Sequence, residues 1–187
     1  MNELSLHILD ICQNSIKANA SLIQIEILED TIHNLFEIVI RDNGSGMDEK
    51  TLSEVADPFF TTRTTRKVGM GVSLFKMAAE MANGTFEIQS QLNKGTSVIA
   101  KFQHNHIDRA PLGSIEDTIG ILVLNEAEID IYYKHKFDQN TYVFDTREVR
   151  KVLDGIPFTN YDIIMWIKNN IKEGILDIHK EETEWNL

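Results

Sequence analysis

The chain has 187 residues, and its composition of 42% apolar and 25% charged residues is typical of a globular protein. The formal net charge of −11 argues against nucleic-acid binding, because such surfaces use Lys and Arg to neutralise phosphates. No apolar run reaches the ~20 residues that cross a bilayer, and no basic segment with an apolar core opens the chain, so we expect neither membrane association nor secretion. Cys12 is the single cysteine, which excludes an internal disulfide and indicates a reducing, cytoplasmic location.

Residues 3–18 are predicted to form a helix. Its apolar residues fall on one broad arc at helical spacing: Leu4, Ile8, Ile11, Cys12 and Ile16. A second set, spaced three, four and three residues apart, forms one polar stripe: His7, Asp10, Asn14 and Lys17. This stripe is either a solvated helix face or a site for metal-bound phosphate. In the second case Asn14 offers a carbonyl oxygen to Mg²⁺, Lys17 contacts phosphate and Asp10 acts as a base for water.

Two alternating segments, 22–28 and 35–41, are predicted to be paired strands joined by a polar turn. The second strand runs into Asp42-Asn-Gly-Ser-Gly-Met47, where Gly44 and Gly46 let the backbone turn and lie against a ligand. An ionised Asp42 only accepts hydrogen bonds, which suits an exocyclic amine such as adenine N6 in a dry pocket. The alternative is an Asx turn that simply ends the strand.

Residues 48–56 are predicted to form a short helix, and the stretch from Asp57 to Gly71 has no clear period. It contains, in order, the aromatic pair Phe59-Phe60, several hydroxyls, the cations Arg63, Arg66 and Lys67, and Gly69-Met70-Gly71. These glycines open a helix at about Val72, where free N–H groups favour a bound anion. The alternative is an ordinary surface loop.

The helix from Val72 is predicted to end at Asn83-Gly84, before a hairpin of 85–91 and 96–103. The composition then becomes polar, so we expect one domain over 1–104 and a small α+β unit over 105–187. The elements expected in this unit are a helix over 114–125, a hairpin of 128–137 and 141–145, and helices over 145–153 and 160–173, the last stopping at Gly174.

The sequence lacks the motifs of several other kinds of functional site. His104 and His106 are two residues apart, but no cysteine or third histidine lies near them in sequence, so a zinc site is not expected. The sequence has neither a Gly-x-Ser-x-Gly elbow nor a Gly-x4-Gly-Lys-Ser/Thr loop. Cys12 lies on the apolar arc of the first helix and is expected in the core.

Taken in order, these segments resemble the GHKL ATP-binding domain, which is shared by gyrase, certain chaperones, mismatch-repair ATPases and histidine kinases. The resemblance covers residues 3–103 and rests on four motifs in the family's order. They are an N box (Asp10–Ala18), a first glycine box (Asp42–Met47), an aromatic box with a second glycine box (Asp57–Arg63 and Gly69–Gly71), and a last box (Gly95-Thr96).

The resemblance implies an α/β (α+β) two-layer sandwich, in which a mixed, mostly antiparallel sheet lies under helices and ATP lies between helices and lid. Asp42 would then accept from the adenine amine close to Thr96, and Asn14 would bind Mg²⁺. Lys17, Arg63 and the amides of Gly69–Val72 would hold phosphates. The residues expected to contact the cofactors ATP and Mg²⁺ are Asn14, Lys17, Asp42, Gly44, Gly46, Met47, Phe59, Arg63, Gly69, Met70, Gly71, Val72 and Thr96.

Two departures from the family pattern bear on catalysis. The mismatch-repair and gyrase branches usually carry a Glu general base where this chain has Asp10, which is one methylene shorter. The lid resembles the histidine-kinase and anti-sigma-kinase branches, yet no dimerisation helix pair with a phosphoacceptor histidine precedes the N box. His7 lies too close to the expected Mg²⁺ position to serve as that acceptor.

The leading hypothesis is a Mg²⁺-dependent ATP-binding module that hydrolyses ATP slowly or uses it as a switch, without a dimerisation or phosphoacceptor domain of its own. The second is a protein kinase that acts in trans on a separate protein. The third is an interaction protein with a degenerate pocket. Residues 105–187 would meet a protein partner, and a homodimer is suggested by family analogy alone.

Overall fold

The computed structural model describes residues 3–56, 70–125 and 129–180. Its strands are β1 (Leu22–Asp30), β2 (Leu35–Asp42), β3 (Thr85–Gln91), β4 (Gly95–Gln103), β5 (Asp130–Phe137) and β6 (Asn140–Asp145). Its helices are α1 (Leu4–Lys17), α2 (Glu49–Ala56), α3 (Met70–Met81), α4 (Ile115–Val123), α5 (Thr146–Leu153) and α6 (Tyr161–Ile178). None of these helices is both long enough and apolar enough to cross a bilayer.

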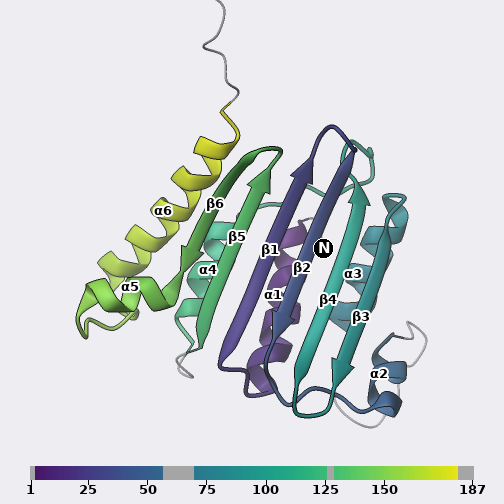
Figure 1. Cartoon of the computed structure of the whole chain (residues 1–187), viewed down its shortest axis with the longest axis horizontal. Helices are drawn as coiled ribbons and strands as arrows, with labels where there is room; N and C mark the ends of the chain where they lie inside the picture. The colour runs from purple at the N-terminus through teal and green to yellow at the C-terminus, as the bar shows by residue number, and fades with distance from the viewer. Residues whose placement is uncertain (1–2, 57–69, 126–128, 181–187) are drawn as a thin grey trace, which may run out of the picture.

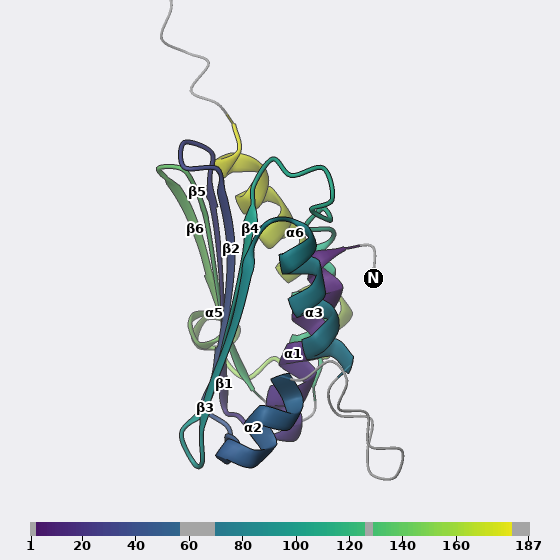
Figure 2. The same ribbon diagram turned by 90° about the vertical axis from the view of Figure 1, so that its right-hand side faces the viewer.

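The strands form one sheet in the order β3-β4-β2-β1-β5-β6 (Figure 1). β1 pairs with β5 in parallel, and every other neighbouring pair in this sheet is antiparallel. Figure 2 shows α1, α3 and α6 together on one side of the sheet. The predicted two-layer α+β sandwich with a mixed, mostly antiparallel sheet is therefore confirmed.

The core lies between the sheet and this helical layer. Because side chains alternate along a strand, every second residue of β1 and β2 faces the helices, while polar residues such as Gln24 and Glu26 take the other face. The residues of these strands that belong to this core are Ile23, Ile25, Ile27, Phe36, Ile38 and Ile40. From the helices they meet Leu4, Ile8 and Cys12, so the cysteine is a core residue as predicted. Each such side chain contributes about 1.5–3 kcal/mol to folding through its burial.

The sheet and its core continue beyond residue 104. β5 pairs with β1 along its length, from Leu22 opposite Asp130 to Glu29 opposite Phe137. The same hydrophobic core contains Ile119 from α4 and Ile167 from α6. The predicted hairpin of 128–137 and 141–145 thus exists, and it extends the sheet of the first hundred residues. A separate role for residues 105–187 stays a prediction.

The end of the last helix was predicted wrongly. α6 does not stop at Gly174 but continues to Ile178. The helix passes so close to β6 at this point that a Cβ on Gly174 would overlap the ring of Tyr142. The ring is fixed because the Tyr142 hydroxyl donates to Asn170 Oδ1 at 2.7 Å. The glycine therefore permits close helix–sheet packing and does not end the helix.

Replacing Gly174 by alanine should lower the free energy of unfolding by about 1–3 kcal/mol through overpacking against Tyr142. Intrinsic helix propensity alone predicts the opposite sign, a gain of about 1 kcal/mol. Gly120→Ala in α4 is the matched control, because its Cβ would meet only the flexible Lys168 side chain at 3.2 Å. Chemical denaturation of both variants measures the difference. Equal effects of the two substitutions would contradict the packing explanation.

Candidate functional site

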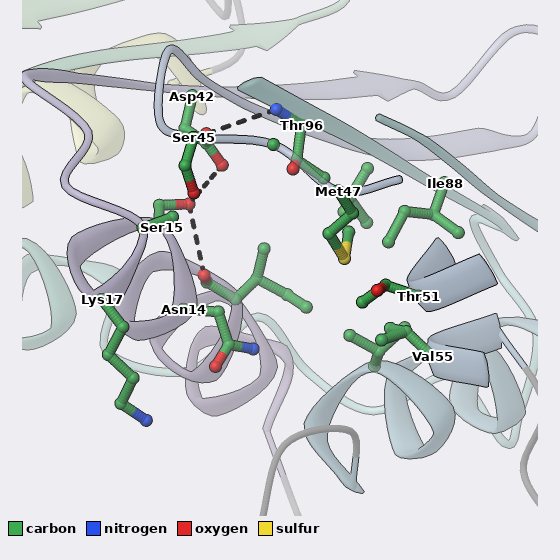
Figure 3. A pocket seen from close by; sticks show the side chains of 15 residues that line it. Asn14, Ser15, Lys17, Asp42, Ser45, Met47, Thr51, Val55, Ile88 and Thr96 are labelled. Atoms are coloured by element: carbon green, nitrogen blue, oxygen red, sulfur yellow. Dashed lines mark hydrogen bonds between the residues drawn. The ribbon is translucent and has the colours of Figure 1, made fainter. Parts of the chain in front are cut away.

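A cavity of about 280 Å³ lies between α1, the end of β2, α2 and the strands β3 and β4. This volume is close to the lower end of the range of small-molecule pockets, about 300–1,000 Å³. Most of its wall is apolar, formed by Ile11, Met47, Val55, Val72, Ile88 and Val98. Figure 3 shows Asp42 and Thr96 at one end of it, with Asn14 and Lys17 projecting from α1.

Asp42, the last residue of β2, is held by three separate segments. Its Oδ2 accepts from the Ser15 hydroxyl of α1 at 2.6 Å. Its Oδ1 accepts from the amide of Gly44 at 2.9 Å and from the amide of Thr96 at 3.3 Å. A carboxylate offers about four acceptor positions, so one remains for a ligand in the cavity. Two of the dashed lines in Figure 3 mark the contacts of Asp42 with Ser15 and Thr96, and the third joins the Ser15 hydroxyl to the carbonyl of Ile11.

The glycine loop after Asp42 packs tightly against its surroundings. The hydrogen bond from the Gly44 amide to Asp42 forms an Asx turn. The motif therefore does end the strand in such a turn, as the alternative explanation predicted. Gly46 has a φ of +63°, and a Cβ there would collide with the carbonyl of Gln91. Met47 follows, lines the cavity and donates its amide to Ser90 Oγ at 2.8 Å. The conformation of this loop is therefore fixed by its packing against the rest of the fold, and the cavity lies beside it.

The polar residues of α1 divide between the cavity and the neighbouring helix. Asn14 and Lys17 line the cavity. Asp10 lies one turn earlier and faces the first turn of α3, where the position of a Cβ on Gly71 would be 3.0 Å from Asp10 Oδ2. Asp10 therefore lies beside the N-terminal turn of α3, and backbone amides at such a turn can donate to a nearby acceptor. Of the residues expected there, Val72 also reaches the cavity wall.

His7 does not belong to the polar stripe, which corrects the prediction for this position. Its side chain is buried because α3 packs over it, and its ring stacks on Phe75 with centroids 5.1 Å apart. Burial lowers the pKa of His7, and the charge of Asp10 opposes this effect. In the described part of the chain, His7 Nδ1 has no hydrogen-bond partner.

Replacing His7 by phenylalanine should keep the stacking and remove an unpaired buried nitrogen, so we expect the free energy of unfolding at pH 7 to rise by about 1 kcal/mol or more. The folded protein binds this proton less readily than the unfolded chain, whose pKa is near 6.5. The wild type should therefore lose stability as the pH falls through 6.5, and the advantage of His7→Phe should grow. Denaturation at pH 7.5 and 5.5 tests this, and parallel pH slopes would contradict it.

Several predicted site residues are not placed. Phe59, Arg63 and Gly69 lie outside the described residues, and Met70 is described only as the first residue of α3. Other cavity residues were missed by sequence reasoning: Ser15, Ser45, Thr51, Val55 and Ile88. For two of them the sequence contained a pattern that could have indicated a position in the cavity. Ser15 is a polar residue on the apolar arc of α1, one turn after Ile11, and Val55 lies on the same face of α2 as Thr51, one turn later.

The sequence matches a known protein family and several known proteins. The family described as "Histidine kinase-, DNA gyrase B-, and HSP90-like ATPase" matches residues 2–106. The sensor histidine kinase YvrG of Bacillus subtilis is 28% identical over 94 residues, which cover 48% of this chain and 16% of YvrG. The sensor protein SrrB of Staphylococcus aureus is 38% identical over 69 residues, covering 34% of this chain and 12% of SrrB. The chain thus spans only a small part of the length of these relatives.

A solved structure titled "Aquifex aeolicus MutL ATPase domain complexed with ADP" aligns with a TM-score of 0.48 and 11% identity, covering 82% of this chain and 70% of that one. The family match extends over more than half of the sequence. The chain belongs to the histidine kinase-, gyrase B- and HSP90-like ATPases, and its ATPase domain resembles that of histidine kinases.

Proposed function

We propose that this protein binds ATP with Mg²⁺ in the cavity beside Asp42. The observation that carries the proposal is the fixed carboxylate at one end of an apolar pocket, with one acceptor position unused by Ser15, Gly44 and Thr96. Such an acceptor matches the exocyclic amine of adenine, and the apolar wall matches the faces of the base. Nucleotide binding is also the activity that membership of the ATPase family suggests.

The other end of the cavity is suited to the phosphates and their metal. Asn14 would offer its amide oxygen to Mg²⁺, a hard cation that prefers oxygen ligands. Lys17 would contact phosphate, and the amides of Gly71 and Val72 in the first turn of α3 would add further donors. When bound, Mg²⁺ would neutralise phosphate charge, while Asp10 beside Gly71 would orient and deprotonate a water molecule.

We infer that the bound nucleotide is hydrolysed slowly or acts as a switch read by a protein partner through residues 105–187. The alternative is phosphotransfer in trans to a separate protein. The similarity to sensor histidine kinases favours it, as do the cations of the 57–69 sequence. In both cases the nucleotide can influence a partner only by stabilising one arrangement of the protein more than another.

Replacing Asp42 by asparagine tests the adenine contact. Asparagine retains an oxygen for the amides of Gly44 and Thr96, and its NH₂ group can donate to the Ser15 hydroxyl, so the fold should persist. A donor would then face the adenine amine, and we expect ATP affinity to fall by about 2 kcal/mol, or about 30-fold.

Asp48→Asn is the matched control, because Asp48 is a carboxylate near the loop that accepts from the Thr51 amide and does not line the cavity. Calorimetric titration with Mg·ATP should give the wild-type affinity for this variant. Wild-type affinity in Asp42→Asn, or no Mg·ATP binding by the wild type, would refute the proposed binding mode.

Replacing Asp10 by asparagine separates binding from chemistry. General-base catalysis contributes about 10²–10⁴-fold to a rate, so Asp10→Asn should lose phosphate release or transfer to that extent. Its ATP affinity should stay within a few-fold of the wild type, since Asp10 does not line the cavity. The assay follows γ-labelled ATP, with and without a cell extract, and asks whether label becomes free phosphate or joins a protein.

Asp10→Glu restores the carboxylate and should retain activity that Asp10→Asn lacks. Label fixed on an extract protein would establish the kinase alternative, and label released as phosphate would establish hydrolysis. An Asp10→Asn variant with the full wild-type rate would exclude Asp10 as the base.

A further inference from the structure

A second cluster of titratable side chains lies at the opposite end of the sheet. Glu29, near the end of β1, contacts His135 of β5, His179 directly after α6, and His104 directly after β4. Glu29 is six residues along β1 from Ile23, which pairs with Asp42, so the cluster lies about 20 Å from that end of the cavity. In Figure 1 the yellow end of α6 lies at this edge of the sheet.

Two histidines converge on one oxygen of Glu29. Its Oε1 is 2.9 Å from His135 Nε2 and 3.0 Å from His179 Nε2, and all three atoms lie within 4.8 Å of one another. His135 is fully buried, and the Glu29 side chain is only 12% exposed. Glu29 therefore presents one carboxylate oxygen to two histidine rings in a largely enclosed position.

The contacts of His179 leave a problem in proton placement. Its Nδ1 lies 2.8 Å from the carbonyl oxygen of Ile175, which only accepts, so Nδ1 carries the hydrogen. In the neutral ring Nε2 is then a bare lone pair, and it faces the Glu29 carboxylate oxygen at 3.0 Å. Two acceptors at this distance repel each other. The contact requires either a second proton on His179 or a cation between the two atoms.

The surrounding contacts can hold both histidines with a ring nitrogen directed at a cation. His135 Nδ1 is 2.8 Å from the Tyr133 hydroxyl, which can accept from it and leave Nε2 free. The second Glu29 oxygen, Oε2, is held by His104 Nε2 at 3.0 Å. Proteins commonly orient metal-binding histidines in this way, with the other ring nitrogen bound to a carbonyl or hydroxyl, and ligating carboxylates are themselves hydrogen-bonded.

We propose that Glu29, His135 and His179 form a binding site for a divalent transition-metal ion of the zinc class. Two imidazole nitrogens and one carboxylate oxygen are a set of ligands that zinc accepts, whereas Mg²⁺ and Ca²⁺ prefer oxygen alone. Zinc ligands at about 2.0–2.1 Å in tetrahedral geometry lie about 3.3–3.4 Å apart, so the observed 2.9 and 3.0 Å need only a small expansion. The His179 side chain, 33% exposed, leaves a path for the ion and for a water ligand.

One nearby charge opposes a bound cation. Arg109 acts electrostatically on Glu29, and its guanidinium is occupied by the carbonyl of His104 at 2.6 Å and by the ring of Phe36 at 4.6 Å. A protonated His179 without metal is the competing explanation, and it predicts no zinc binding. With metal bound, the site would join β1, β5 and the end of α6, and so fix the last described helix to the sheet.

Zinc binding to the untagged, chelator-treated full chain tests the proposal, measured by calorimetry and by metal analysis after dialysis. We expect one Zn²⁺ per chain and a rise in melting temperature with Zn²⁺. Replacement of outer hydrogen-bond partners typically lowers metal affinity about 10–100-fold, so loss of a ligand in His179→Gln should cost about 100-fold or more. Tyr133→Phe should give the smaller effect.

His33→Gln is the matched control, because His33 is an exposed histidine that pairs with Asp30, directly after Glu29. It should bind Zn²⁺ as the wild type does. A Co²⁺ absorption spectrum typical of tetrahedral coordination should be present in the wild type and absent in His179→Gln.

Substoichiometric zinc, or equal losses in His33→Gln and His179→Gln, would overturn the proposal. So would unchanged affinity in His179→Gln. Because His179 is partly exposed, this variant should fold, and its circular dichroism and unfolding curve without metal verify that. None of these measurements uses ATP, so their outcome is independent of the proposed nucleotide site.

Discussion

The structure depends on the position of β1, which is hydrogen-bonded to β2 on one side and to β5 on the other. Its side chains alternate strictly, so a shift of register by one residue would move Ile23, Ile25 and Ile27 from the core to the solvent face. Both neighbours are therefore fixed in register by the same buried surface. This places the end of β2 against α1 at one end of the strands, and Glu29 against the end of α6 at the other end.

At the end of the sheet that contains Asp42, the contacts that stabilise the fold also shape the cavity. Asp42 joins α1, the glycine loop and β4 through hydrogen bonds with Ser15, Gly44 and Thr96. These bonds orient the carboxylate before any ligand arrives, so binding needs little rearrangement of this group. The same rigidity means that a change at Asp42 acts on fold and ligand together, and only a substitution of the same shape can separate the two effects.

At the other edge, the segments that meet are distant in sequence. Glu29 is followed 75 residues later by His104 and 150 residues later by His179. Their convergence on one carboxylate couples the C-terminal helix to the central strand of the ATPase sheet. The proposed nucleotide and metal sites thus lie near opposite ends of β1, one beside α1 and the glycine loop and the other beside β5 and α6.

Much of the fold followed from local pattern. The alternation in 22–28 and 35–41 and the helical arc of 3–18 predicted individual strands and a helix, because periodicity is a property of the chain itself. The order of the four motifs carried the family resemblance, and that resemblance implied the sandwich. Asn14, Lys17 and Asp42 were candidates from residue type and spacing, and Thr96 from the resemblance. The fold brings all four to one cavity.

Tertiary structure decided what packing and long-range pairing control. By its spacing His7 was expected on the polar stripe, but α3 packs over it and buries it. Gly174 was expected to end the last helix, but it lies within α6, where the helix packs closely against Tyr142. β1 pairs with β5, whose residues lie about a hundred positions later in the sequence. Glu29 likewise contacts His135 and His179, which lie 106 and 150 positions after it. Local sequence carries no signal for such contacts, because they depend on how whole elements pack against one another.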